Sequence, residues 1–238
     1  MKYVNLGSTG VQVSELCLGT MTFGKEADRQ TSAAIYRRCR EAGINFFDCA
    51  NVYSSGEAER ILGGLITGER HRLIITTKVG GSMGAGPNRE GLSRRHILQE
   101  CEESLQRLNT DWVDVYFAHR FDPLVPMEES LHAFEMLVQQ GKVRYIGVSN
   151  WAAWQIAGAL GVCALKGFQP IRVIQPMYNL VKRQAEVELM PLAQNAGLGV
   201  MAYNPLGGGV LTGKYGLAPE KSTGRLADNA MYRKRYAE

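Results

Sequence analysis

The sequence lacks the features that mark several classes of protein. It has no apolar run long enough to cross a membrane, and Met1 leads directly into Lys2 and Tyr3 without an apolar leader. Its five cysteines are odd in number and include no CxxC pair. This usage argues against a disulfide framework and indicates free thiols in a reducing compartment. We therefore expect a cytoplasmic protein with no membrane partner.

A strong charge bias is also missing. The formal net charge is +4, from 27 lysines and arginines against 23 acidic residues. The basic residues are scattered except at Arg37-Arg38, Arg94-Arg95 and 233–235, and no regular set of aromatics is interleaved with them. We expect these groups on solvated helix faces and no nucleic-acid partner, because a nucleic-acid groove combines positive charge with stacking aromatics. The four histidines show no ligand spacing, so no metal is expected.

The chain does have a regular alternation of apolar runs and helix-period segments. The helix-period segments are 29–42, 57–66, 94–107, 128–140, 152–160 and 185–196. The apolar runs, seven in number, are 16–21, 45–49, 73–78, 113–119, 143–149, 172–175 and 200–203. Most of these runs are continuously apolar, which is typical of parallel strands that are covered on both faces. A chain of 238 residues with this repeat predicts either a doubly wound sheet or a (β/α)8 barrel.

Local signals support the predicted helix ends. Ser93 can cap the helix over 94–107, and Gly43, Gly141 and Gly197 stand where helices are expected to end. Before the first repeat, residues 3–6 and 11–14 flank a turn at 7–10. We read them as a small β-hairpin that could close the floor of a barrel.

Polar residues at the ends of the predicted strands favour the barrel. They are Asp48, Lys78, His119, Ser149, Asn150, Gln175 and Tyr203. The carboxyl ends of barrel strands converge on one face, where barrel enzymes place their active sites. A doubly wound sheet would instead need a glycine-rich phosphate turn after its first strand, and residues 19–24 lack the GxGxxG spacing. Each polar residue alone also fits a structural role; their joint placement makes the pattern informative.

These residues stand in motifs that resemble the aldo-keto reductase family, in the branch that includes bacterial reductases and potassium-channel β subunits. The motifs, in family order, are Phe47-Asp48-Cys49-Ala50-Asn51-Val52-Tyr53, Thr77-Lys78, Tyr116-Phe117-Ala118-His119, Gly147-Val148-Ser149-Asn150, Gln175-Pro176-Met177-Tyr178-Asn179 and Tyr203-Asn204-Pro205-Leu206-Gly207. The resemblance covers nearly the whole chain. It implies an α/β fold, a parallel (β/α)8 TIM barrel, and reduction of an aldehyde or ketone by hydride from NADPH.

The resemblance implies catalytic roles for four residues. Tyr53 would be the general acid that protonates the alkoxide formed when a carbonyl receives hydride. The pKa of a free tyrosine is about 10, and the positive charge of Lys78 would lower it. Asp48 would hold Lys78, and His119 would bind the substrate carbonyl. Positioned proton transfer of this kind contributes about 10²–10⁴-fold to the rate.

The resemblance also implies a site for NADP(H), with NAD(H) left open. Ser149, Asn150 and Gln175 would bind the nicotinamide carboxamide, and Tyr203 would stack on the ring, although a core aromatic at a strand end fits Tyr203 nearly as well. The remaining implied cofactor contacts, the first two near the nicotinamide ribose, are Thr20, Met21 and Asp48. The residues expected to line an apolar pocket for a small carbonyl substrate are Phe23, Tyr53 and Trp151.

The strand count departs from the family pattern, because only seven of the eight barrel strands can be found. We expect residues 1–238 to form a single aldo-keto reductase-like barrel domain without the C-terminal part that carries the eighth strand and the adenosine contacts in this family. Without the adenosine contacts we expect weak cofactor binding, and an open sheet edge predicts self-association into a homo-oligomer. The stretch 207–238, glycine-rich and then basic, is one candidate to cover that edge.

Two other functions remain open at this stage. Channel β subunits share the barrel, so the site could be a cofactor sensor in a regulatory subunit. From chemistry alone, Lys78 at a strand end could instead form a Schiff base with a carbonyl substrate.

Overall fold

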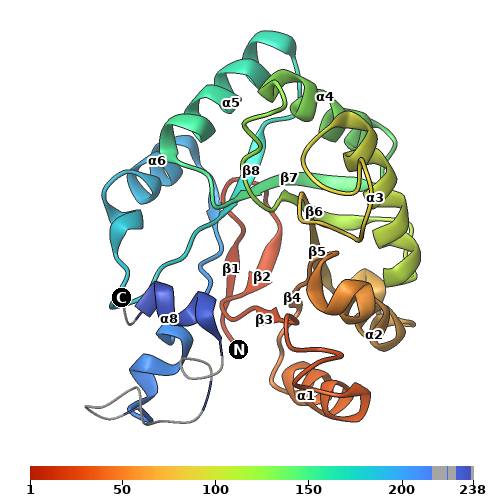
Figure 1. The fold of residues 1–238 in the computed structure, drawn as a ribbon, viewed down its shortest axis with the longest axis vertical. Coiled ribbons are helices and arrows are strands. Elements are labelled where there is room, and N and C mark those ends of the chain that lie inside the picture. The colour runs from red at the N-terminus through yellow and green to blue at the C-terminus, as the bar shows by residue number, and fades with distance from the viewer. Residues whose placement is uncertain (216–223, 225–228, 237–238) are drawn as a thin grey trace.

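The computed structural model describes residues 1–215, 224 and 229–236. Seven parallel strands form one curled sheet in the order in which they occur along the chain, with helices packed on its outer face (Figure 1). The strands are β3 (Leu18–Gly19), β4 (Phe46–Asp48), β5 (Ile74–Val79), β6 (Val113–Ala118), β7 (Val143–Ser149), β8 (Ile171–Gln175) and β9 (Gly199–Val200). This arrangement confirms the predicted barrel architecture, and among the described residues β3 and β9 are the two edges.

The helices follow the predicted repeat. They are α1 (Arg29–Glu41), α2 (Glu57–Ile66), α3 (Arg94–Leu108), α4 (Met127–Gln139), α5 (Ala153–Lys166), α6 (Leu189–Ala196) and α8 (Ala230–Tyr236). The hydroxyl of Ser93 accepts a hydrogen bond from the backbone N–H of His96 at 3.3 Å, so Ser93 caps α3 as predicted. Gly43, Gly141 and Gly197 all have positive φ and end their helices.

The predicted hairpin is present and closes the floor of the barrel. Strands β1 (Tyr3–Asn5) and β2 (Gln12–Ser14) are antiparallel and lie across the centre of the arc of helices (Figure 1). A Cβ at Gly7, whose φ is +56°, would come within 2.3 Å of the backbone nitrogen of Gly199, so the turn packs directly on β9. The side chains of the inner core come from the hairpin and four strands or strand ends, and include Leu6, Val13, Phe46, Val115, Phe117, Val173 and Met201.

Three predicted segments are corrected by the structure. The helix expected over 185–196 is a short 3₁₀ turn, Gln184–Glu186, followed by α6. Pro191 explains the break, because a proline lacks the N–H of a helix interior and fits only in the first turn. The helix expected over 152–160 continues to Lys166 despite its glycines. The strand expected over 200–203 ends at Val200, and Tyr203 forms only an isolated bridge with Met177.

The stretch from Gly207 also has structure where residues are described. A 3₁₀ segment, Gly207–Thr212, is followed after a gap in the described residues by α8. Val210 packs against the buried Tyr215 and Tyr232 in a small separate core.

Candidate active site

A buried ion pair lies at the carboxyl ends of β4 and β5. Strand alternation turns Thr76 and Lys78 of β5 toward Asp48 of β4, inside the barrel. The Lys78 Nζ donates to both carboxylate oxygens of Asp48 and to the carbonyl oxygen of Cys49, each at 2.6 Å. The Lys78 side chain is fully buried. All three ammonium protons are therefore bound inside the protein.

The protonation state of Lys78 follows from this geometry. Burial lowers the pKa of Lys78, but Asp48, Tyr53 and Cys49 together outweigh that effect, and the net direction is upward. A lysine must be deprotonated to attack a carbonyl. An ammonium that is fully bound and held positive is poorly suited to Schiff-base chemistry, so the structure argues against that alternative.

Tyr53 lies directly beside the ion pair. The Lys78 Nζ is 5.1 Å from the centroid of the Tyr53 ring. Burial raises the pKa of Tyr53, while the Lys78 charge acts in the opposite direction, and the net shift is upward. We expected Lys78 to lower this pKa below its free value; it does act in that direction, but the desolvation of the phenolate is larger. The phenol is therefore protonated near neutrality, as a proton donor must be.

His119 faces Tyr53 from the end of β6. The two rings meet edge to face with centroids 6.0 Å apart. Burial, aided by the nearby Lys78 charge, lowers the pKa of His119 to about 4. The imidazole is consequently neutral near pH 7 and can donate a hydrogen bond from one nitrogen without carrying a charge.

Ser149, Asn150, Gln175 and Tyr203 form a connected polar group next to this pair. The Ser149 hydroxyl donates to the Gln175 carbonyl oxygen at 2.8 Å, and the Tyr203 hydroxyl donates to the Asn150 Oδ1 at 2.8 Å. Gln175 Nε2 donates to the Asp48 carboxylate at 3.1 Å. Asn150 and Gln175 also line a cavity of about 370 Å³. The group is thus linked to Asp48 through Gln175.

Thr20 and Met21, the first two residues of the implied cofactor site, differ in their exposure to solvent. Thr20 is fully buried, and its hydroxyl and backbone N–H both donate to the Asp48 carbonyl oxygen at 2.9 Å. Met21 is exposed at the rim. Of the expected apolar lining, Phe23 is buried in the core with 1% exposure, so it presents no surface to a substrate.

An aromatic group borders the site, and of its members only Trp151 was expected from the sequence. Phe121, in the segment after β6, packs edge to face on Trp151 at 5.0 Å and lies 6.3 Å from Trp154, measured between ring centroids. Trp151 is buried, whereas Trp154 is 68% exposed. The sequence shows one aromatic residue after β6 and two after β7. Their spacing alone does not predict that the three rings pack together.

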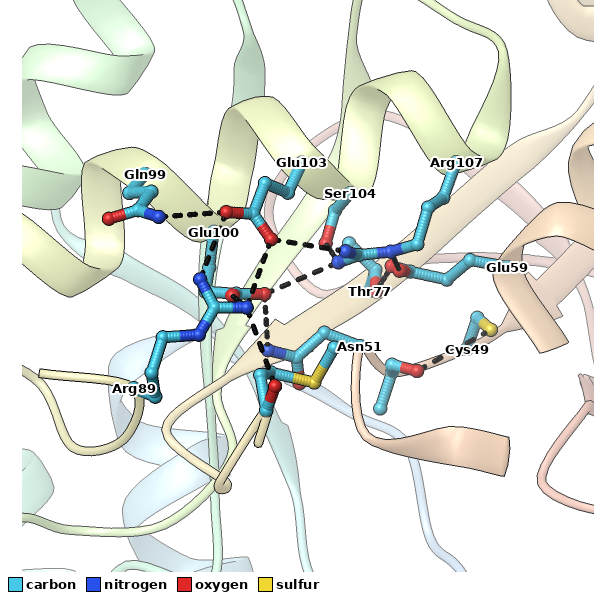
Figure 2. A network of polar contacts seen from close by, with 12 residues as sticks. Cys49, Asn51, Glu59, Thr77, Arg89, Gln99, Glu100, Glu103, Ser104 and Arg107 are labelled. Carbon is cyan, nitrogen blue, oxygen red and sulfur yellow. Dashed lines mark hydrogen bonds and ion pairs between the residues drawn. The ribbon is translucent and has the colours of Figure 1, made fainter. Parts of the chain in front are cut away.

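A second missed feature lies behind the site, on the outer face of the sheet. It is a set of buried glutamates and partly buried arginines between β5, α2 and α3 (Figure 2). Within the described residues, no cluster of three or more potential ligands could hold a metal ion, and no helix is long and apolar enough to cross a membrane.

The fold and this site together define the class of protein. Residues 15–235 match the model of the aldo/keto reductase family. The chain belongs to the aldo/keto reductase family, a family of oxidoreductases, as its motifs predicted.

Three relatives illustrate the branch. A probable voltage-gated potassium channel subunit beta from Arabidopsis thaliana is 41% identical over 232 residues, which is 95% of this chain and 70% of the relative. An uncharacterized oxidoreductase of Bacillus subtilis is 40% identical over 90% of this chain and 69% of its own length. A putative voltage-gated potassium channel subunit beta of Schizosaccharomyces pombe is 41% identical over 88% of this chain and 63% of the relative.

Proposed function

We propose that this chain reduces an aldehyde or ketone with hydride from NADPH. The observation that supports this function best is the convergence of Tyr53, His119 and the Lys78–Asp48 pair at the carboxyl ends of one barrel. These groups supply a proton donor, a neutral hydrogen-bond donor and a fixed positive charge around one point. Membership of an oxidoreductase family supports the same assignment.

The chemistry assigns one task to each residue. NADPH, when bound, supplies the hydride to the carbonyl carbon. Tyr53 gives its hydroxyl proton to the carbonyl oxygen as negative charge develops there, and Lys78 stabilises the phenolate that remains. Asp48 fixes Lys78 in place and keeps it charged. His119, neutral near pH 7, donates a hydrogen bond that orients the carbonyl oxygen.

The polar group around Gln175 fits a nicotinamide carboxamide. The amide nitrogen of Gln175 donates a hydrogen bond to Asp48, and no described residue donates a hydrogen bond to its amide oxygen. That oxygen can accept from the carboxamide nitrogen, while Ser149 and Asn150 hold the surrounding backbone and side chains. In this assignment Tyr203 packs against the ring, and Thr20 and Met21 lie on the ribose side.

One assay tests the proposal directly. The protein is mixed with NADPH and a reactive aromatic aldehyde, and the absorbance of the reduced cofactor is followed. We expect oxidation of NADPH that depends on both protein and aldehyde, with NADH compared in parallel to assign the cofactor. No oxidation with any of a panel of aldehydes and ketones would overturn the proposal.

A second candidate function is favoured by the names of the relatives. Two of the three relatives described above are named as potassium channel β subunits. In that role the same site would act as a cofactor sensor in a regulatory subunit, and turnover would be secondary. Saturable NADPH binding without carbonyl-dependent oxidation would favour this candidate over the enzyme.

A further inference from the structure

Two buried glutamates behind the active site form a continuous network with a partly buried arginine. Its central members are Glu59 of α2 and Glu100 and Arg107 of α3; both glutamate side chains are fully buried, and that of Arg107 is 9% exposed. Arg107 Nε donates to Glu59 Oε2 at 2.6 Å, and its NH2 group donates to Glu100 Oε2 at 3.3 Å (Figure 2). We call these three residues the buried charge network.

The network contacts the segment that carries Tyr53. The side-chain nitrogen of Asn51 donates to Glu100 Oε2 at 2.9 Å, and Asn51 is itself fully buried (Figure 2). The backbone N–H of Asn51 donates to the carbonyl oxygen of Lys78. One residue therefore ties the Tyr53 segment to both the network and the strand that carries Lys78.

The network also contacts the strand of Lys78. The hydroxyl of Thr77 donates to Glu59 Oε1. Because side chains alternate along a strand, Thr77 faces the network on the outer face of the sheet while Lys78 faces the barrel interior. Glu59 thus fixes β5 one residue away from the catalytic ammonium.

The turn after Tyr53 needs such support. Ser54 and Ser55 have φ of 49° and 53°, a left-handed conformation that costs about 1–2 kcal/mol per non-glycine residue. Next to them, a Cβ at Gly56 would lie 2.8 Å from Cδ of Arg107, so the end of the turn packs on the network. Strain of this kind persists only where the surroundings over-determine the backbone.

Burying these charges is a poor route to stability. The desolvation of buried ion pairs often cancels their attraction, and well-packed apolar side chains of similar volume serve stability as well or better. Hydrogen bonds from a fixed network do, however, define directions that apolar contacts do not. Stability alone does not explain why the network contacts both the segment of Tyr53 and the strand of Lys78.

We propose that Asn51, Glu100 and Arg107 are positioning residues that hold Tyr53 at its working distance from Lys78. This inference rests on the proposed carbonyl reduction. A misplacement of catalytic groups by about 1 Å can cost on the order of 10²-fold in rate. Loss of the Asn51–Glu100 contact should therefore lower kcat and leave cofactor binding largely intact.

The central variant is Asn51→Ala, and the matched control is Glu102→Gln. Glu102 lies on the same helix as Glu100 but pairs with Lys142 at the surface. We expect Asn51→Ala to reduce kcat by about tenfold or more, with the KM for NADPH changed by less than about twofold, because the group acts on the chemical step. The pH–rate midpoint assigned to Tyr53 should also shift. Glu102→Gln should leave all three quantities unchanged.

A charge exchange separates positioning from general packing. Asn51→Asp alone places two buried carboxylates face to face and should be severely impaired. Adding Glu100→Gln restores an amide-to-carboxylate hydrogen bond with the groups exchanged, and should recover most of the lost kcat. Failure of the double variant to recover activity, although it folds as well as the parent by circular dichroism, would contradict the inference.

A readout without turnover keeps the two proposals distinguishable. 3-Fluorotyrosine at position 53 gives a single ¹⁹F resonance that reports the surroundings of the phenol. Asn51→Ala should move or broaden this resonance, and Glu102→Gln should not. A parent protein that never oxidises NADPH would refute the proposed function, while the resonance would still decide the positioning. An unmoved resonance in a folded Asn51→Ala protein would overturn the positioning role.

Discussion

The ammonium of Lys78 is bound by Asp48 and by the carbonyl oxygen of Cys49. Its positive charge lies 5.1 Å from the centroid of the Tyr53 ring, close enough to act on the phenol. Replacing Lys78 with a residue of similar length and no charge isolates this effect.

We expect Lys78→Met to reduce carbonyl reduction at least as strongly as loss of the tyrosine hydroxyl. The positive charge favours the phenolate, so its removal raises the pKa of Tyr53 further and moves the alkaline limb of the pH–rate profile to higher pH. The profile of the remaining activity is the measurement. If the alkaline midpoint of the remaining activity is the same as in the parent protein, Lys78 is not coupled to the proton donor.

Tyr53→Phe removes the proposed proton and little else. We expect kcat to fall by about 10²-fold or more, because general acid catalysis is worth at least that much, while the affinity for NADPH is nearly unchanged. Fluorescence titration measures the binding and absorbance the turnover. If the variant keeps more than about a tenth of the parent kcat, Tyr53 is not the general acid, because loss of a general acid should cost about 10²-fold or more.

His119 should make the fold sensitive to acid. Its pKa is lowered from 6.5 to about 4 by burial and by Lys78, so between these values the unfolded chain binds more protons than the folded one. Stability must then fall as pH decreases from about 6.5 towards about 4, and be fully present above that window. His119→Asn should flatten the dependence of the unfolding midpoint on pH there. Parallel curves for parent and variant would rule out the shift.

The grouping of the candidate site residues could be predicted because polar side chains at strand ends are conspicuous in a buried sheet. The network of Glu59, Glu100 and Arg107 was not, since charges on helices are normally solvated. A signal exists in hindsight: His96, Glu100 and Ser104 recur every fourth residue of α3 and are buried together with its apolar stripe. The rotation of a helix about its axis, however, is fixed by packing and not by spacing alone.

Helices α2 and α3 approach closely at one glycine. A Cβ at Gly63 would lie 2.6–2.7 Å from backbone atoms of Arg107 and Leu108, which cannot move without shifting α3. Gly64, its neighbour in the same helix, is exposed and has nothing within 4 Å.

This pair gives a matched test of helix packing. Gly63→Ala should destabilise the protein, because the clash involves backbone. Gly64→Ala should stabilise it by about 0.5–1 kcal/mol through helix propensity. Chemical denaturation measures both. A stabilising Gly63→Ala would mean that the two helices are not in backbone contact.

The boundaries of the elements show where local pattern was sufficient. The predicted bounds of α2, 57–66, match the structure because apolar period, acidic first turn and surroundings agree. The helix expected over 185–196 is interrupted before α6 because of Pro191. The apolar periodicity continues through this proline and therefore predicted one continuous helix. The length of β9 could not be predicted, because its two residues pair with β8 and pack on the turn of the hairpin, and both contacts are non-local.

At the scale of the whole molecule, the sheet presents β3 and β9 as edges among the described residues. Edge strands expose unpaired N–H and C=O groups that can pair with another chain. Val200, on β9, is also 40% exposed. We expect a preparation of these 238 residues to self-associate in a concentration-dependent manner, measured by light scattering.

A charge on the edge should reduce this association. Val200→Lys places a lysine on β9, a common means of blocking edge-to-edge pairing. Leu124→Lys is the control, because Leu124 is 91% exposed in the segment between β6 and α4 and belongs to neither edge. Equal association in the two variants, or a monodisperse parent at every concentration, would contradict an edge-mediated contact.

In the proposed reaction, hydride passes from the nicotinamide to a carbonyl carbon beside Tyr53. Its most direct test uses NADPH carrying deuterium at both C4 positions and an aromatic aldehyde, with mass spectrometry of the alcohol. We expect one deuterium on the carbinol carbon with the parent protein, and almost no alcohol with Tyr53→Phe. Alcohol without deuterium, or labelled alcohol formed equally well by Tyr53→Phe, would contradict it.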